Sequence, residues 1–439
     1  MNNKFLNHFD YILLLCVLAL TSMGIMFIYS SGINSQGVNV SNEYIKQIIW
    51  MGVGLIFMIT FTLLDYRRFE RYAPILYGVG IIVLIYTKLF GRYVNGARSW
   101  IGIGELGIQP SEIMKIIFII FLSWYLNKST NENPLKRFLI SLAIMFVPFA
   151  LILLQPDLGT ASVYLPVFLL MCFIANLPLR YIMIVLCGGM ITIIFGVLPI
   201  WQTEIAHKSI AIINVLTNTK LLLLVITSSF LITIIGAIGH IMFKKKYFYW
   251  ITYVFGIITF ALIGGWAVRK VLKPYQIQRL IIFMNPDSDP RGAGWNIIQS
   301  KIAIGSGNFL GRGYLQGTQS HLRFLPQQST DFIFSILAEE AGFIGGIFVY
   351  SIFLLILLKI IVIIKNTTNT FGSYIASGIL GMFFFHFLVN VGMVMGIMPI
   401  TGIPLPFLSY GGSALLVNMS CIGIIMSINA RRLDFTPNF

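Results

Sequence analysis

Long apolar runs, separated by short polar segments, repeat from one end of the chain to the other. Most runs approach about twenty residues, the length of a helix that crosses a bilayer core of about 30 Å. The runs lack the strict alternation of apolar and polar residues that a membrane-spanning strand shows. Because lipid offers the backbone no hydrogen-bond partner, helices are expected. The pattern predicts about twelve spans, at 11–30, 46–64, 74–90, 110–126, 136–154, 160–177, 180–201, 220–242, 249–268, 331–358, 373–398 and 405–430.

The composition agrees with a membrane protein. Hydrophobic residues make up 57% of the chain and charged residues 10%, and the mean hydropathy is +0.86. A soluble domain carries about 25% charged residues. We therefore predict an all-α polytopic membrane protein, in which residues 1–439 form a single integral membrane domain.

The positions of Lys and Arg predict the orientation of the spans, because loops that carry these residues tend to stay in the cytoplasm. If the N-terminus is cytoplasmic, every connection on the inner side is basic, whereas the outer segments 31–45 and 155–159 contain no Lys or Arg. Both termini are therefore expected in the cytoplasm. The basic residues of the inner connections are Arg67, Arg68, Arg71, Lys128, Lys136, Arg137, Arg180, Lys244, Lys245, Lys246, Lys365, Arg431 and Arg432.

The largest polar segment, residues 269–330, is expected outside the cell, before the tenth span. It is strongly basic, with only Asp287 and Asp289 as acidic residues. Because long loops escape the charge rule, this charge indicates an anionic partner at the outer surface, or contact with anionic lipid headgroups. The apolar stretch 297–304 predicts a helix at the membrane interface. No soluble basic face is expected, so the net charge of +15 does not indicate nucleic-acid binding.

Ionisable side chains inside spans are costly to bury, so each one is a functional candidate. Glu112 and Lys115 open the span 110–126 and share one helix face. They could neutralise each other as an ion pair, or Lys115 could meet a phosphate or carboxylate in an outward cavity. Asp157, on the outer side between two spans, could cap the following helix, bind a cation or pair with a buried basic residue.

Asp331 lies where the large loop meets the tenth span, at the predicted outer edge of the membrane. It could cap that helix, since Ser, Thr and Asp suit a helix start, or act as a catalytic carboxylate beneath the basic loop. Pro and Gly interrupt the last span within residues 402–413. Such a break either lines a cavity, where irregular backbone is tolerated at membrane depth, or is a plain kink. These features alone fit a transporter as well as an enzyme.

Six sequence runs, in order along nearly the whole chain, resemble the SEDS family (shape, elongation, division and sporulation), also called the RodA/FtsW/SpoVE family. The segments SDPRGAG, IIQSKIAIGSG and GTQS resemble those of the RodA branch, which serves cell elongation. The six runs are Arg98–Ile101, Gln109–Glu112, Gln155–Thr160, Asn285–Gly307, Phe324–Phe334 and Ile403–Ser413.

The resemblance implies an enzyme of the bacterial cytoplasmic membrane. It implies a peptidoglycan glycosyltransferase that polymerises lipid II at the outer face and releases undecaprenyl pyrophosphate during cell elongation. The essential aspartate of the family matches Asp331, so the resemblance assigns it as the general base for the acceptor sugar hydroxyl, or as the residue that orients this hydroxyl. A divalent cation, Mg²⁺ or Mn²⁺, is expected. Its site is not indicated by any dense ligand motif, and Asp157 is one candidate ligand.

The resemblance also suggests substrate contacts and partners. Negative charge on the leaving pyrophosphate needs basic groups or a metal, which Lys115 and the basic loop could supply. Expected partners are lipid II, the undecaprenyl pyrophosphate-linked glycan, a class B penicillin-binding protein transpeptidase and other membrane proteins of the elongation complex. The candidate substrate-binding residues are Lys115, Glu112, Arg98, Trp100, Arg291, Gln299, Lys301, Ser409 and Ser413.

The chain departs from the family pattern in two places. The family implies ten spans, but residues 180–268 contain three apolar runs where one is expected, so an extra hairpin that includes residues 202–248 is predicted. In addition, residues 327–329 read Gln-Gln-Ser where many relatives carry Glu and His. A flippase for lipid-linked precursors and a non-catalytic scaffold are alternative functions. The charged motifs gather on the outer side, which favours the polymerase over a transport path.

Overall fold

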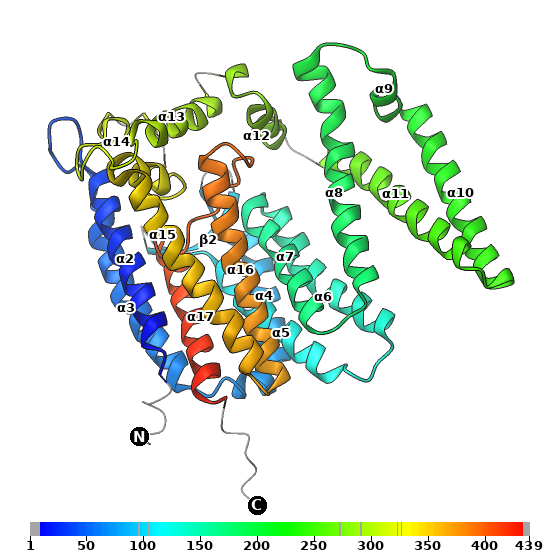
Figure 1. Ribbon diagram of the computed structural model, residues 1–439, viewed down its shortest axis with the longest axis horizontal. Coiled ribbons are helices and arrows are strands. Elements are labelled where there is room, and N and C mark those ends of the chain that lie inside the picture. The colour runs from blue at the N-terminus through cyan, green and yellow to red at the C-terminus, as the bar shows by residue number, and fades with distance from the viewer. Residues whose placement is uncertain are drawn as a thin grey trace, which may run out of the picture. The chain divides into compact units, whose positions relative to one another are not determined.

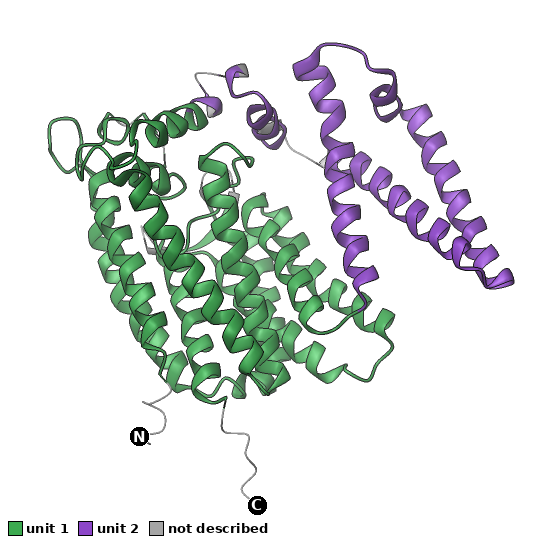
Figure 2. Ribbon diagram, viewed as in Figure 1, with its two compact units in different colours: residues 1–177, 296–439 green, residues 178–295 purple. Residues whose placement is uncertain are grey.

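The computed structural model describes residues 9–94, 97–103, 106–271, 274–289, 292–322, 324–325 and 327–432. The described chain is mostly helical (Figure 1). It divides into two compact units, one made of residues 1–177 and 296–439 and the other of residues 178–295 (Figure 2). The prediction of a single integral membrane domain stays a prediction.

Unit 1 is a bundle in which α16 and α17 are the most enclosed helices. Helix α17 packs against α3, and α16 packs against α7, α15 and α5. Helix α13 begins in unit 2 and continues into unit 1. The helices of unit 1 are α2 (Tyr11–Ser31), α3 (Glu43–Leu63), α4 (Arg68–Phe90), α5 (Pro110–Lys128), α6 (Pro134–Leu154), α7 (Leu158–Ile174), α13 (Ala293–Ser306), α14 (Thr318–His321), α15 (Ile333–Asn366), α16 (Thr370–Val394) and α17 (Gly412–Ala430).

A small antiparallel sheet forms within residues 91–109, where the sequence analysis predicted no regular element. Its three strands are arranged in the order β1-β2-β3, and Ile101 pairs with Ile108. The strands are β1 (Arg92–Val94), β2 (Ala97–Ile103) and β3 (Leu106–Ile108). Because these strands are short, they leave the all-α fold class unchanged.

Unit 2 contains the three apolar runs of residues 180–268. Helices α10 and α11 form an antiparallel pair that turns at Lys244, and α11 also packs against α8. Ser229 of α10 hydrogen-bonds to Thr259 of α11 (Oγ–Oγ1 2.8 Å). The predicted insertion 202–248 covers η1, α9, α10 and the start of α11. The elements are α8 (Leu179–Trp201), the π-helix η1 (Gln202–Ala206), α9 (Ala211–Thr217), α10 (Thr219–Phe243), α11 (Lys246–Val271), α12 (Pro274–Met284) and the 3₁₀-helix η2 (Pro286–Ser288).

Ten helices in the described part of the chain are long and apolar enough to cross a membrane. Two further helices occupy the remaining predicted spans: α5, which carries buried charges, and α7, which is apolar but has only 17 residues. The prediction of an all-α, multi-pass membrane protein is confirmed. The ten long apolar helices are α2, α3, α4, α6, α8, α10, α11, α15, α16 and α17.

Two predicted span boundaries are wrong. The span expected at 331–358 extends to Asn366, and Gly342 (φ 65°, ψ −161°) divides α15 into a short and a long helix. The span expected at 405–430 begins only at Gly412, because residues 405–411 are irregular. Leu405 and Phe407 are each only 1% exposed. Their apolar character therefore reflects burial within the protein, which a hydropathy window cannot distinguish from a spanning helix.

The first residues of α2 and the last residues of α17 lie at one end of unit 1, and α14 and the start of α15 lie at the other (Figure 1). At the first end, Arg431 donates to the carbonyl oxygens of Thr62 (3.1 Å) and Leu63 (2.6 Å) at the end of α3. Such helix ends carry partial negative charge, so they stabilise a guanidinium. Several residues that the sequence predicted to be cytoplasmic therefore gather with the described chain ends.

Candidate active site

Segments from four predicted motifs meet at the end of unit 1 that lies away from the described chain ends. The start of α5 contacts the start of α7, since Gln109 Nε2 donates to Asp157 Oδ2 (2.8 Å). Gly159 of α7 packs so closely against the carbonyl oxygen of Thr401 that a Cβ would overlap it. In turn, a Cβ at Gly402 would lie 3.5 Å from Oδ2 of Asp331. The fold therefore places these motifs around one carboxylate.

Asp331 lies just before α15 and is half-buried. The N-cap of α15 is Phe332, so Asp331 does not occupy the capping position that the sequence left open. The backbone carbonyl of Asp331 accepts a hydrogen bond from Asn390 Nδ2 (3.0 Å). The same amide group donates to the carbonyl of Ile403 (2.8 Å). One side chain of α16 thus links the Asp331 backbone to the irregular segment before α17.

The two residues before Asp331 are also held through their carbonyl groups. The carbonyl of Ser329 accepts from the backbone N–H of Tyr410 (2.8 Å). The carbonyl of Thr330 accepts from the Ser409 hydroxyl (2.6 Å), and this hydroxyl itself accepts from the N–H of Leu405 (2.8 Å). Ser409 was predicted to bind substrate, and that role stays a prediction. In the structure, Ser409 is 5% exposed, and its hydroxyl links the segment before α15 to the irregular segment before α17.

Lys115 is buried in a hydrogen-bonded chain inside the bundle. Its ammonium contacts Glu112 Oε1 (2.8 Å) and His386 Nε2 (3.2 Å), and these three residues are 1–4% exposed. His386 Nδ1 lies 3.2 Å from the carbonyl oxygen of Pro404. A neutral imidazole fits both contacts if Nδ1–H donates to the carbonyl and Nε2 accepts from the ammonium. The geometry favours the ion-pair interpretation of Lys115 and Glu112, and their contact with substrate stays a prediction.

Asp157 is the N-cap of α7. Its Oδ1 accepts from the backbone N–H of Thr160 (3.0 Å), and its Oδ2 accepts from the Thr160 hydroxyl (2.8 Å) and from Gln109. Both carboxylate oxygens are therefore already hydrogen-bonded within the protein. In the part of the chain that the structure describes, His, Cys, Asp and Glu form no group of three or more that could hold a metal ion.

The predicted residues of the large loop fall into three environments. Arg291 lies outside the described residues. Gln299 is buried, and Lys301 is exposed, both on α13. Ser300, between them, hydrogen-bonds to Ser335 Oγ (2.7 Å), one turn beyond Asp331, and to the carbonyl oxygen of Val394 (2.7 Å). These contacts hold the exposed Lys301 at the same end of unit 1 as Asp331. The helix predicted at 297–304 is present as part of α13.

The remaining predicted residues lie on β2 and at the start of α17. Arg98 is exposed, and its Nη1 lies 3.5 Å from the carbonyl oxygen of Leu89. Trp100 is half-buried and covers Gly107, where a Cβ would lie 3.0 Å from its ring. Ser413 is 5% exposed in the first turn of α17.

Sequence reasoning missed two buried polar residues that shape this site. Gln47 of α3 is fully buried, donates to the carbonyl of Ser409 (3.2 Å) and accepts from the N–H of Gly411 (3.3 Å). Asn390 of α16 is also fully buried. Both lie in apolar runs, where an amide side chain needs a partner. The sequence shows that Gln47 and Asn390 lie in apolar runs, but it does not show which groups they hydrogen-bond to.

A comparison of the chain with protein families shows which family it belongs to. The model of the FtsW/RodA/SpoVE family, described as cell cycle proteins, matches residues 10–208 and 203–433. The chain belongs to the FtsW/RodA/SpoVE family. The resemblance that the six sequence runs suggested is confirmed.

Relatives in this family match the chain over nearly its whole length. Peptidoglycan glycosyltransferase RodA of Treponema pallidum (strain Nichols) is 54% identical and covers 97% of this chain and 98% of its own. Peptidoglycan glycosyltransferase MrdB of Escherichia coli (strain K12) is 33% identical, and the match covers 97% of this chain and 94% of that protein.

Solved structures share the fold. A chain from a structure on the coordination of polymerization and crosslinking by a peptidoglycan synthase complex matches with a TM-score of 0.68, at 24% identity, over 97% of this chain and 98% of that chain. The crystal structure of the rod shape determining protein RodA of Thermus thermophilus matches with a TM-score of 0.60, at 21% identity and the same coverage.

In this FtsW/RodA/SpoVE protein, two buried carboxylates hold the loop that precedes Asp331. Glu339 Oε1 accepts from the N–H (2.8 Å) and hydroxyl (3.0 Å) of Thr318 and from the N–H of Gln319 (3.0 Å). Glu340 accepts from the hydroxyl of Ser30 and from the N–H of Leu315 (3.1 Å). These bonds therefore fasten the C-terminal end of the short helix between Asp331 and Gly342.

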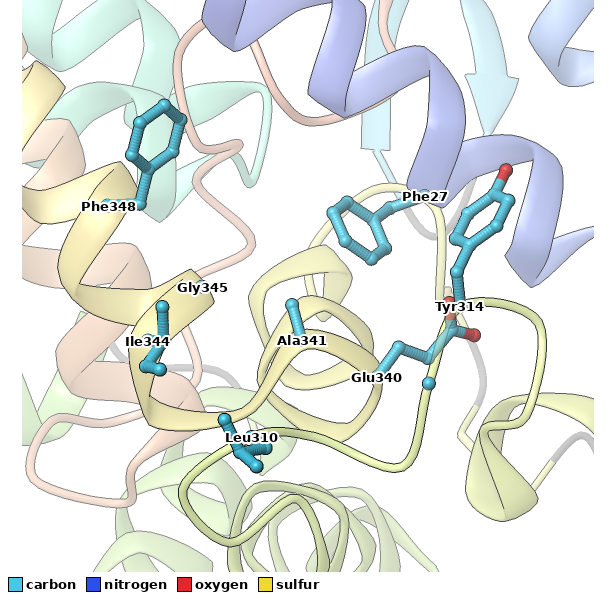
Figure 3. A pocket seen from close by; sticks show the side chains of 9 residues that line it. Phe27, Leu310, Tyr314, Glu340, Ala341, Ile344, Gly345 and Phe348 are labelled. Carbon is cyan, nitrogen blue, oxygen red and sulfur yellow. The ribbon is translucent and has the colours of Figure 1, made fainter.

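A pocket of about 440 Å³ lies beside Glu340. In Figure 3, Phe27 of α2, Tyr314 of the loop and Glu340 lie at one side of the pocket, and Leu310, Ile344 and Phe348 lie at the other. Its walls are mostly apolar, and Tyr314 closes one side by donating its hydroxyl to the carbonyl of Met26 (3.0 Å). Partial burial raises the pKa of the Tyr314 hydroxyl.

Proposed function

We propose that this protein is a peptidoglycan glycosyltransferase that polymerises lipid II into glycan strands during cell elongation. The observation that carries the proposal is the position of Asp331, whose carboxylate lies beside the irregular segment before α17 and whose backbone is held by hydrogen bonds. Full-length relatives named as peptidoglycan glycosyltransferases support it.

In the proposed reaction, Asp331 takes the proton from the 4-hydroxyl of the acceptor sugar on lipid II. The hydroxyl oxygen then bonds to the anomeric carbon of the donor glycan. The bond between that carbon and the phosphate oxygen breaks, and undecaprenyl pyrophosphate leaves with the electron pair. A positioned general base contributes about 10²–10⁴-fold to such a step. The half-buried position of Asp331 leaves part of the residue accessible to a substrate.

Negative charge on the leaving diphosphate requires cations beside it. Lys301 is exposed on α13, and the bonds of Ser300 hold this helix near the start of α15. Arg98 is a second exposed cation, on β2. We assign the diphosphate to these two side chains. Lys115 is a weaker candidate, because its ammonium already contacts Glu112 and His386.

A divalent cation is also proposed. Asp157 does not fit as its ligand, because both of its oxygens cap α7 or bind Gln109. Mg²⁺ is often held by one or two carboxylates together with substrate phosphates, without a cage of protein ligands. Asp331 fits that requirement, since Gly402 places no side chain beside its carboxylate. The cation would neutralise charge on the leaving diphosphate.

The proposed orientation puts the described chain ends in the cytoplasm and Asp331 at the outer face. The basic residues at the end of α3 and α17 support it through the positive-inside rule. A class B penicillin-binding protein transpeptidase is the proposed partner, since a neighbour of the same fold comes from a peptidoglycan synthase complex.

Polymerisation of lipid II tests the function directly. The chain is purified together with the transpeptidase and supplied with lipid II and Mg²⁺, and the products are separated by electrophoresis. We expect glycan ladders from the parent and a rate about 10²–10⁴-fold lower for Asp331→Asn, which keeps the shape of the side chain but cannot take a proton. Chelation of the metal should also stop the reaction. Equal ladders from Asp331→Asn and the parent would remove Asp331 from its proposed role.

A further inference from the structure

We propose that Asn390, Ser409 and Gln47 are positioning residues that fix the backbone of Asp331 for glycosyl transfer. This inference rests on the proposed function of Asp331 as the general base. None of the three is inferred to touch the reacting atoms. Asn390 and Ser409 hold carbonyl groups of the segment that carries the carboxylate, and Gln47 holds the turn that contains Ser409.

The central observation is that three consecutive carbonyl groups, those of residues 329–331, each accept a hydrogen bond from a different donor. The donors are the N–H of Tyr410, the hydroxyl of Ser409 and the amide of Asn390, at 2.8, 2.6 and 3.0 Å. Residues before a helix start do not receive the regular hydrogen bonds of that helix. Here they receive donors from chain segments about 60–80 residues further along, so the position of Asp331 depends on tertiary contacts.

Asn390 joins two sides of the site with one amide group. Its Nδ2 donates to the carbonyls of Asp331 (3.0 Å) and Ile403 (2.8 Å), which uses both of its N–H donors. The residue is 0% exposed and sits in the enclosed helix α16. Because an enclosed helix moves little, the amide fixes the distance between the Asp331 backbone and the irregular segment beside its carboxylate.

Gln47 extends the same support to α3. Its side chain binds both the carbonyl of Ser409 (3.2 Å) and the N–H of Gly411 (3.3 Å), and it is 0% exposed. It therefore holds the turn from which Ser409 and Tyr410 reach the Asp331 segment. Donors from α16 and from the segment before α17 therefore converge on three peptide groups, and α3 supports that segment through Gln47.

This support matters because a carboxylate is joined to its backbone by only two rotatable bonds. A shift of the backbone therefore moves the base relative to the acceptor hydroxyl. A displacement of about 1 Å in a catalytic group can cost on the order of 10²-fold in rate. Loss of one carbonyl contact should thus slow the chemical step and leave substrate binding largely intact.

The test compares Ser409→Ala and Asn390→Leu with the parent in the complex with the transpeptidase. Ser409→Ala removes one hydroxyl, and Asn390→Leu keeps the side-chain volume but removes both donors. We expect kcat per lipid II-binding site to fall about 10- to 100-fold, with KM and the lipid II dissociation constant within about twofold of the parent. The control is Ser420→Ala. Ser420 is a buried serine of α17 whose hydroxyl donates to the carbonyl of Leu416 in its own helix (2.7 Å), and the variant should behave as the parent.

Counting binding sites separates positioning from misfolding. A purely structural defect lowers the number of lipid II-binding sites in step with the rate, and it leaves the rate per site unchanged. Combination with Asp331→Asn provides a second criterion, since positioning residues should cause no further loss once the base is absent. If Asp331→Asn is inactive while Ser409→Ala and Asn390→Leu keep the parental rate per site, the positioning inference is wrong and the proposed function stands. If Asp331→Asn is fully active, the proposed role of Asp331 is itself wrong.

Discussion

At the residue scale, the structure assigns partners to the charges that the sequence placed inside spans. A buried charge without a partner is far more costly than a buried pair. The ammonium of Lys115 meets the Glu112 carboxylate and the ring of His386, and the Asp157 carboxylate meets donors at the start of α7. Asp331 differs from the Lys115–Glu112 pair, because it is half-buried and lies at the end of unit 1. Exposure therefore separates the proposed base from this buried ion pair.

Removal of Lys115 tests this distinction. In Lys115→Met the carboxylate of Glu112 remains buried without its cation, so we expect a loss of roughly 3–5 kcal/mol in stability. The double variant Lys115→Met, Glu112→Leu should recover much of that loss. Thermal unfolding in detergent measures both effects. Should Lys115→Met keep parental stability but lose lipid II binding, the lysine would instead contact substrate.

At the element scale, the break in α15 allows the large loop to dock. Gly342 (φ 65°) and Gly311 (φ 82°) approach each other so closely that a Cβ at Gly342 would overlap the backbone nitrogen of Gly311. The carboxylates of Glu339 and Glu340 then hold the following loop residues. The loop and the short helix after Asp331 therefore form one packed layer. Glycine is needed here both for its positive φ and for the close approach.

Substitution of this glycine should release the loop. In Gly342→Ala, the positive φ is strained and the new Cβ overlaps Gly311, so we expect residues 307–320 to exchange amide hydrogens faster and polymerisation to slow. Hydrogen exchange with mass spectrometry measures the first effect. The matched control is Gly78→Ala in α4, where a Cβ meets nothing within 4 Å and alanine favours the helix. Unchanged exchange in Gly342→Ala would show that the loop docks without this contact.

At the scale of the whole molecule, unit 1 has chemically different ends. Arginine side chains cap helix ends near the start of α2 and the end of α17, while the Asp331 site lies at the opposite end. Unit 2 contributes three long apolar helices, including the α10–α11 pair that the sequence indicated as an addition to the family core. We expect this asymmetry of unit 1 to place the proposed base at one side of the membrane.

Labelling of single cysteines in intact cells tests this orientation. Asn308→Cys lies in the loop beside α15 and Thr130→Cys lies in the connection after α5, and both positions are exposed. We expect a membrane-impermeant maleimide to label Asn308→Cys in intact cells and Thr130→Cys only after permeabilisation. The reverse pattern would put Asp331 on the cytoplasmic side, where it could not act on an externalised substrate.

The sequence by itself determined the helical membrane fold, the positions of most spans and the expected asymmetry of charge. It could do so because lipid requires long apolar runs and leaves basic residues at the ends of helices. It also brought Asp331 to attention, through its place between a basic loop and a span. The family motifs added a reaction, and the family comparison supports the membership on which that reaction rests.

Only the tertiary structure decided how the site is held. The contact of Lys115 with His386, the contact of Gly342 with Gly311 and the donors to residues 329–331 join segments that are far apart along the chain. Hydropathy reports whether a residue is removed from water, and it treats lipid and protein interior alike. It therefore could not separate the irregular segment 405–411 from a spanning helix, because the same apolar side chains serve both. Hydrogen-bond partners depend on direction and distance in three dimensions, and the order of residues does not contain that information.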